Sequence, residues 1–146
     1  MNYDLILGII NIVLISTTPL VFAGIGELVT EKSGVLNLGL EGLMLVGAVS
    51  GFISLVITGN YFYSFILSIL SGVVLSSIFA FFVLRLLTNQ IATGLALTIF
   101  GIGLSAMLGK KFGGTPINGL SPYYLIIFSF ILVFLINYIL YKTKAG

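Results

Sequence analysis

The 146-residue sequence has no cysteine, no histidine and few charges: six Lys or Arg and four Asp or Glu. Without cysteine it can form no disulfide and no thiolate site, and without histidine it lacks the commonest general base and metal ligand. Soluble domains carry about 25% charged residues, whereas this chain carries 7%. The composition therefore excludes a soluble enzyme. Because the few lysines are scattered and form no basic face, it also excludes a nucleic-acid-binding protein.

Two sequence signals are also missing. No G-x-x-x-x-G-K-[ST] motif occurs, so we expect the chain to bind no ATP of its own and any ATP to be hydrolysed by another subunit. The first residues, Met1 to Asp4, contain no positive charge, whereas a secretory signal peptide opens with a basic stretch. The first apolar run is therefore interpreted as a retained membrane helix.

Long uncharged blocks dominate what is present. The blocks cover residues 5–26, 42–84, 86–109 and 112–141. A membrane-spanning helix needs about 20 apolar residues, and the turn-forming Gly59-Asn60 pair divides the longest block. The predicted spans are 5–26, 38–57, 62–84, 91–109 and 123–141. The sequence thus predicts an all-α integral membrane protein with about five transmembrane helices, forming one domain over residues 1–146.

Lysine and arginine predict the orientation of these spans. Lys32, Arg85, Lys142 and Lys144 follow spans one, three and five, whereas Lys110 and Lys111 follow span four. Cytoplasmic loops carry the excess of positive charge. The bias favours an outside N-terminus and an inside C-terminus.

Small residues recur every four positions in three of the spans. The third span has Ser64, Ser68, Gly72, Ser76 and Ala80; the fourth has Gly101, Ser105 and Gly109; the second has Gly47 and Gly51. Four residues make about one helical turn, so each set forms a groove that admits another helix closely. Since such residues are also common in membrane helices generally, packing and mere composition both stay open for the shortest set.

A glycine-rich polar segment joins the first two spans. Residues 24–42 hold three of the four acids, and we expect glycines to break the helix there. Asn37 and Glu41 are spaced to share one helical face. The segment either lines a polar cavity at membrane depth or is an ordinary loop, with Glu27, Glu31 and Lys32 in the loop proper.

Two smaller features complete the candidates. Asn89 and Gln90 precede the fourth span, where an amide caps the helix or contacts a polar solute; capping is favoured because Asn is a preferred N-cap. Pro19 is expected to kink the first span, with the hydroxyls of residues 16–18 satisfying freed carbonyls.

Residues 31–42 (EKSGVLNLGLEG) and 88–97 (TNQIATGLAL) resemble two segments of a known family. The family is the permease subunits of bacterial ABC importers of the branched-chain amino acid/ribose type, and the similarity is greatest to its nucleoside and simple-sugar members. The resemblance covers essentially the whole chain. Family members are usually about twice as long, and their later ATPase-contacting segment has no counterpart here, so the chain resembles an N-terminal half.

The resemblance implies a non-enzymatic transport subunit in the bacterial cytoplasmic membrane. Its implied partners are a second permease subunit, cytoplasmic ATP-binding subunits and an extracytoplasmic solute-binding protein. We expect no cofactor and no metal in this chain, and Asn37, Glu41, Asn89 and Gln90 near the solute path. Two alternatives stay open: a self-sufficient small oligomeric carrier or channel, and a non-transporting membrane assembly subunit.

Overall fold

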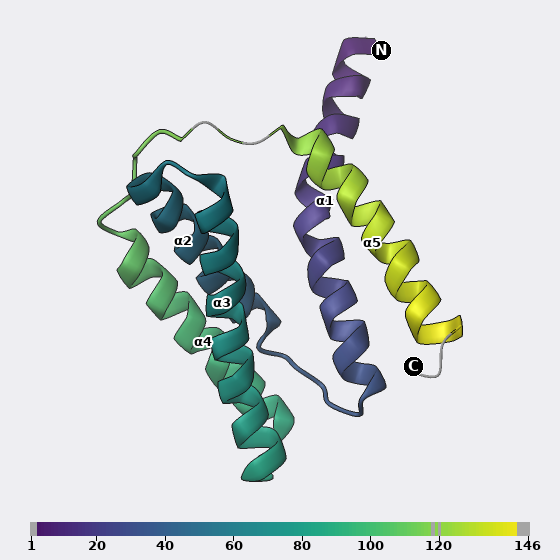
Figure 1. Ribbon diagram of the computed structural model, residues 1–146, viewed down its shortest axis with the longest axis vertical. Helices are drawn as coiled ribbons and strands as arrows, with labels where there is room; N and C mark the ends of the chain where they lie inside the picture. Colours follow the sequence, from purple (N-terminus) through teal and green to yellow (C-terminus); the bar gives the residue numbers. More distant parts are fainter. Residues whose placement is uncertain (1–2, 118, 120, 143–146) are drawn as a thin grey trace. The chain divides into compact units, whose positions relative to one another are not determined.

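The computed structural model describes residues 3–117, 119 and 121–142, and its regular structure there is entirely helical. The elements are α1 (Tyr3–Lys32), α2 (Leu40–Thr58), α3 (Tyr61–Ala80), η1 (Phe81–Arg85), α4 (Gln90–Gly109) and α5 (Pro122–Lys142), as Figure 1 shows. Within the described residues, five helices are long and apolar enough to cross a membrane, with η1 extending α3. The prediction of an all-α polytopic membrane protein is confirmed.

The first helix is longer than the span predicted for it. α1 continues through Gly24, Gly26 and Glu27 and ends only at Lys32, so placing Glu27, Glu31 and Lys32 in a loop was wrong. A glycine inside a helix costs about 1 kcal/mol, which the helical hydrogen bonds outweigh. The break instead begins at Gly34, whose φ of 83° is left-handed and suits a glycine.

Pro19 lies inside α1 without ending it. The hydroxyls of Thr17 and Thr18 donate to the carbonyls of Val13 and Leu14, each at 2.9 Å. These carbonyls lie one turn back from the hydroxyls, and neither belongs to Ile15, the residue that proline deprives of its helical donor. The kink itself stays a prediction.

The helices form two compact units. The first comprises α1 and α5, within residues 1–34 and 119–146. Asn11 Nδ2 donates to the Tyr123 hydroxyl at 3.3 Å, and the rings of Phe22 and Phe128 lie 6.0 Å apart. From Asn11 to Phe22 along α1, the contacted residue of α5 changes from Tyr123 to Phe128. Residue numbers therefore increase in the same direction in both helices, so α1 and α5 run parallel.

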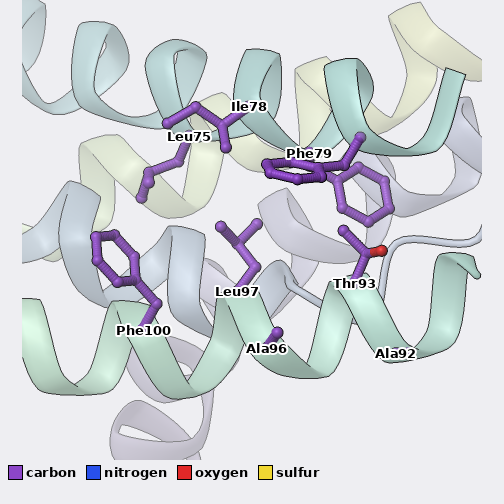
Figure 2. Close-up of a pocket in the computed structure, with 9 residues that line it drawn as sticks. Leu75, Ile78, Phe79, Ala92, Thr93, Ala96, Leu97 and Phe100 are labelled. Atoms are coloured by element: carbon purple, nitrogen blue, oxygen red, sulfur yellow. The ribbon is translucent and has the colours of Figure 1, made fainter. Parts of the chain in front are cut away.

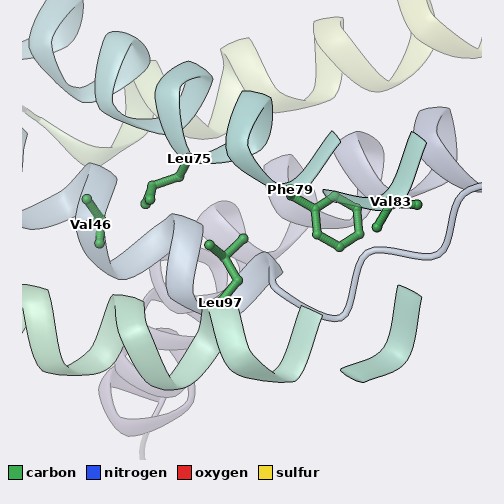
Figure 3. Packing of buried hydrophobic residues seen from close by; sticks show 5 residues of the cluster. All are labelled: Val46, Leu75, Phe79, Val83 and Leu97. Carbon is green, nitrogen blue, oxygen red and sulfur yellow. The ribbon is translucent and has the colours of Figure 1, made fainter. Parts of the chain in front are cut away.

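The second unit comprises α2, α3, η1 and α4, within residues 35–118. α3 and α4 both pack on α2 and share far fewer contacts with each other. Five buried side chains form the apolar core of this unit (Figure 3): Val46, Leu75, Phe79, Val83 and Leu97. This arrangement makes α2 the central helix of the unit.

The predicted row of small residues on α3 meets α2 over its first half. Ser64 Oγ donates to the Gly51 carbonyl at 2.7 Å, and a Cβ added at Gly47 would lie 3.4 Å from Ser68 Oγ. Within this unit, a Cβ at Gly72 would meet no described atom within 4 Å. Packing through Gly72, Ser76 and Ala80 therefore stays a prediction.

Candidate functional site

The two polar segments singled out in the sequence meet inside the second unit. Residues 35–39, which precede α2, lie along the first turns of α4. The Leu36 N–H donates to Gln90 Oε1 at 2.8 Å, and Thr98 Oγ1 donates to the Leu38 carbonyl at 2.9 Å. These bonds join the non-helical backbone to α4 at two points about two turns apart. We call residues 35–39, with the α4 residues that bind them, the polar joint.

Side chains supply the hydrogen bonds that a helix would otherwise supply here. The Asn37 side chain is 7% exposed, and its Oδ1 accepts from the Gly39 N–H at 2.9 Å. Gln90 and Thr98 bind two further backbone groups of the segment, as described above. An unpaired backbone group in a bilayer costs several kcal/mol. The polar joint therefore lets non-helical backbone lie within a membrane-spanning unit.

Glycines allow α2 and α4 to approach this closely. A Cβ added at Gly101 would lie 2.5 Å from Gly42 Cα, and one added at Gly42 would lie 2.7 Å from the Leu97 carbonyl oxygen. A Cβ at Gly94 would lie 2.9 Å from the Leu38 nitrogen. Real Cβ atoms do not sustain such distances from backbone atoms, so the crossing requires glycine at these positions.

The polar joint lies deep within the span of α3. Gly47 and Gly51 of α2 lie opposite Ser68 and Ser64, so α2 and α3 are antiparallel. Extending that register places Leu40, the first residue of α2, near the level of Leu75. At 1.5 Å per residue, this level is about 15 Å from the Arg85 end of the spanning helix. α2 therefore begins about 15 Å from the end of the α3–η1 helix, and the non-helical residues 35–39 precede it.

Glu41 occupies the first turn of α2 and is exposed in the second unit. The next residue, Gly42, is buried against α4, while Leu45 and Ala48 continue the exposed face on which Glu41 lies. A carboxylate is favourable at a helix N-terminus because it opposes the positive end of the dipole. Glu41 thus places a negative charge on the open face of α2, away from α3 and α4.

Asn89 and Gln90 contact backbone. Asn89 Oδ1 accepts from the Ala92 N–H at 3.1 Å and caps α4, which confirms the capping interpretation. Gln90 binds Leu36 in the polar joint. Beside them, the hydroxyls of Thr88 and Thr93 lie 2.9 Å apart. This cluster fixes the start of α4. It thereby also fixes which α4 residues lie beside residues 35–39.

The polar groups of residues 24–34 belong to the first unit, which contains α1 and α5. Lys32 Nζ donates to the Leu140 carbonyl at 3.0 Å and lies 4.5 Å from the centre of the Tyr141 ring. The Thr30 hydroxyl donates to the Glu27 carbonyl at 2.8 Å. The two Lys32 contacts join the end of α1 to the end of α5, whereas the Thr30 bond lies within α1. Among the described residues, no three His, Cys, Asp or Glu side chains are grouped as metal ligands would be.

Sequence reasoning missed Thr98, Gly94 and the role of Gly42. A signal was present, since Gly94, Thr98 and Gly101 follow one another at helical spacing and form one small, partly polar face of α4. Only the fold shows that this face covers residues 35–39.

Known proteins support a single family. The model of the family described as "Branched-chain amino acid transport system / permease component" matches residues 9–146. A putative glucose ABC transporter permease protein of Haloferax volcanii is 40% identical over 112 residues, which are 77% of this chain and 34% of that protein.

Two shorter similarities fall on bacterial proteins. A nucleoside ABC transporter permease protein of Lactococcus lactis subsp. cremoris is 51% identical over 37 residues, 25% of this chain and 12% of that protein. A guanosine ABC transporter permease protein of Bacillus subtilis is 45% identical over 40 residues, 27% of this chain and 12% of that protein. The matched part of the chain thus spans about a third or less of each of these relatives. No solved structure matches the chain.

Proposed function

Because this chain belongs to the branched-chain amino acid transport system / permease component family, we propose that it forms part of the membrane-spanning pathway of an ABC importer. The proposed solutes are nucleosides or simple sugars, since the relatives are named for glucose, nucleosides and guanosine. The proposed location is the bacterial cytoplasmic membrane.

The polar joint is the observation on which this proposal depends. Non-helical backbone at membrane depth is tolerated where it is covered by protein or lines a water-filled cavity. In transporters, interrupted helices place backbone and helix ends beside the solute site. Here residues 35–39 are bound by side chains of α4, and α2 begins about 15 Å from the Arg85 end of the α3–η1 helix, with Glu41 in its first turn.

Glu41 is the proposed solute-path residue among the four polar candidates. Asn37, Asn89 and Gln90 each have a side-chain oxygen bound to backbone, which suits them to shaping the path. A carboxylate facing lipid at mid-depth is costly, so intramembrane acids face water or a partner. Glu41 on an aqueous path would accept hydrogen bonds from the hydroxyl groups that sugars and nucleosides share.

The proposed importer has separate subunits for ATP hydrolysis, because this sequence contains no P-loop. ATP would be bound and hydrolysed by cytoplasmic partner subunits. A second permease subunit would complete the path, and an extracytoplasmic binding protein would deliver the solute. Movement would occur by alternating access, with helices rocking about the central path.

Uptake by Glu41 variants tests the proposal. In a strain that carries the whole operon, we expect Glu41→Gln and Glu41→Ala to lower uptake of the transported nucleoside or sugar about tenfold, the effect of losing about 1.4 kcal/mol of a charged hydrogen bond. Membrane levels of the chain, measured by immunoblot, should not change. Glu31→Gln is the matched control, because Glu31 is an exposed carboxylate in the last turn of α1.

Two results would contradict the proposal. Unchanged uptake and unchanged levels in both Glu41 variants would remove Glu41 from the path. Solute flux through proteoliposomes containing this chain and no ATPase would favour the self-sufficient carrier instead.

A further inference from the structure

An apolar groove of about 500 Å³ separates α3 from α4 on the face not covered by α2. Figure 2 shows side chains from both helices pointing toward one another across it. Its floor is formed by Leu75, Phe79 and Leu97, which are at most 8% exposed. Its rim includes Ile78 and Phe100, which are 43% and 54% exposed. The groove is therefore open along its side.

The lining of the groove suits hydrocarbon. Thr93 is the one lining residue with a polar side chain, and its hydroxyl already bonds to the Asn89 carbonyl and the Thr88 hydroxyl. A sugar or nucleoside would lose its hydrogen bonds to water here and gain none from the lining, so its burial in the groove is unfavourable. The groove is thus unsuited to the polar solutes proposed above.

The length of the groove matches one leaflet of a bilayer. Along α3 and η1 it runs from Leu75 to Phe82, about 10 Å, and along α4 from Ala92 to Phe100, about 12 Å. Half of the hydrocarbon core is about 15 Å. The Phe82 end lies beside the α3–α4 turn, where the spanning helix ends at Arg85. One acyl chain, entering from the leaflet at that turn, would fill the groove.

The charge at this end of the groove is positive. Arg85 is exposed in η1, and the α4 N-terminus beside it carries the positive end of the helix dipole. Glu41 is the one Asp or Glu of this unit, and among the described residues it forms no ion pair with Arg85. The turn therefore complements an anionic headgroup.

We propose that the groove between α3 and α4 binds one acyl chain of an anionic phospholipid, with the lipid phosphate at the α3–α4 turn near Arg85. This site is separate from the polar joint, and its occupation does not depend on which solute is transported.

Because the chain contains no tryptophan, a single tryptophan introduced by substitution is the only source of tryptophan fluorescence. Phe82→Trp and Phe100→Trp each place one tryptophan in the groove, and Phe81→Trp is the matched control, because Phe81 is exposed at the same depth and does not line the groove. Each full-length variant is reconstituted in phosphatidylcholine vesicles containing increasing fractions of brominated phosphatidylglycerol or brominated phosphatidylcholine. Fluorescence quenching measures how often each lipid contacts the tryptophan.

In the two groove variants, brominated phosphatidylglycerol should quench at a lower mole fraction than brominated phosphatidylcholine. Adding Arg85→Gln should remove a preference of about fivefold, as expected from about 1 kcal/mol per basic residue near a lipid surface. The Phe81→Trp control should respond equally to both lipids. Equal quenching by both lipids in the groove variants would overturn the proposal. So would an absence of quenching in them, because it would mean that protein covers the groove.

Discussion

At the scale of single residues, the contact between Gly42 and Gly101 sets the distance between α2 and α4. A methyl group at Gly101 would meet the backbone of Gly42 at 2.5 Å from Cα and 2.6 Å from the carbonyl oxygen. Backbone cannot rotate away as a side chain can. The two helices would have to separate, and the bonds of the polar joint would lengthen with them.

We therefore expect Gly101→Ala to destabilise the chain by about 1–3 kcal/mol, as overpacking does. Gly103→Ala is the control, since a Cβ there meets nothing within 4 Å in the described part of the chain and alanine favours a helix by about 1 kcal/mol. Thermal unfolding in detergent should show a lower midpoint for the first variant and an equal or higher one for the second. Equal midpoints for all three chains would show that the crossing is not close.

At the scale of elements, the non-helical stretch before α2 is held by the side chains of another helix. Gln90 binds the Leu36 N–H, while its neighbour Asn89 caps α4. Although they are adjacent amides, the two side chains stabilise different elements. Their substitutions should therefore loosen different segments.

Hydrogen–deuterium exchange can separate these effects. Gln90→Leu should speed exchange at residues 35–39 about tenfold, since one hydrogen bond is worth about 1 kcal/mol or slightly more. Asn89→Ala should speed exchange in the first turn of α4 and leave Leu36 protected, because an N-cap contributes about 1 kcal/mol to its own helix. If Gln90→Leu left residues 35–39 as protected as before, Gln90 would not hold the non-helical stretch.

At the scale of the whole molecule, the prediction of five successive crossings requires neighbouring spans to run in opposite directions. α1 and α5 run parallel, as do α2 and α4, whereas α2 and α3 are antiparallel. Odd-numbered spans share one direction in such a chain. The lysine and arginine bias predicts that the ends of α1 and α3 lie on the cytoplasmic side.

Single cysteines in this cysteine-free chain test that topology. In intact cells, a membrane-impermeant thiol reagent should label Thr58→Cys and Lys110→Cys, while Ser33→Cys and Leu86→Cys should react only after the membrane is opened. Both pairs lie at exposed positions at helix ends. Labelling of Ser33→Cys and Leu86→Cys from opposite sides would contradict the five-span topology.

The sequence by itself determined three properties of the chain: that its helices lie in lipid, that its fold is all-α, and which family it resembles. Its uncharged blocks need lipid, their lengths fix the helices, and the segments 31–42 and 88–97 carry the family resemblance, because these are local properties of consecutive residues. It also located the Asn89 cap. The predicted end of α1 was wrong. Gly24 and Gly26 have low helix propensity, but the backbone hydrogen bonds of α1 continue through both residues.

Only the tertiary structure decided which of these segments touch. Residues 35–39 lie against Gln90 and Thr98, Gly42 lies against Gly101, and α3 and α4 leave an apolar groove between them. Helical periodicity shows which residues share one face of a helix, but it does not show which other helix packs against that face. The pairing of residues 35–42 with α4 depends on contacts between residues more than fifty positions apart, and close packing of backbone on backbone is what selects it.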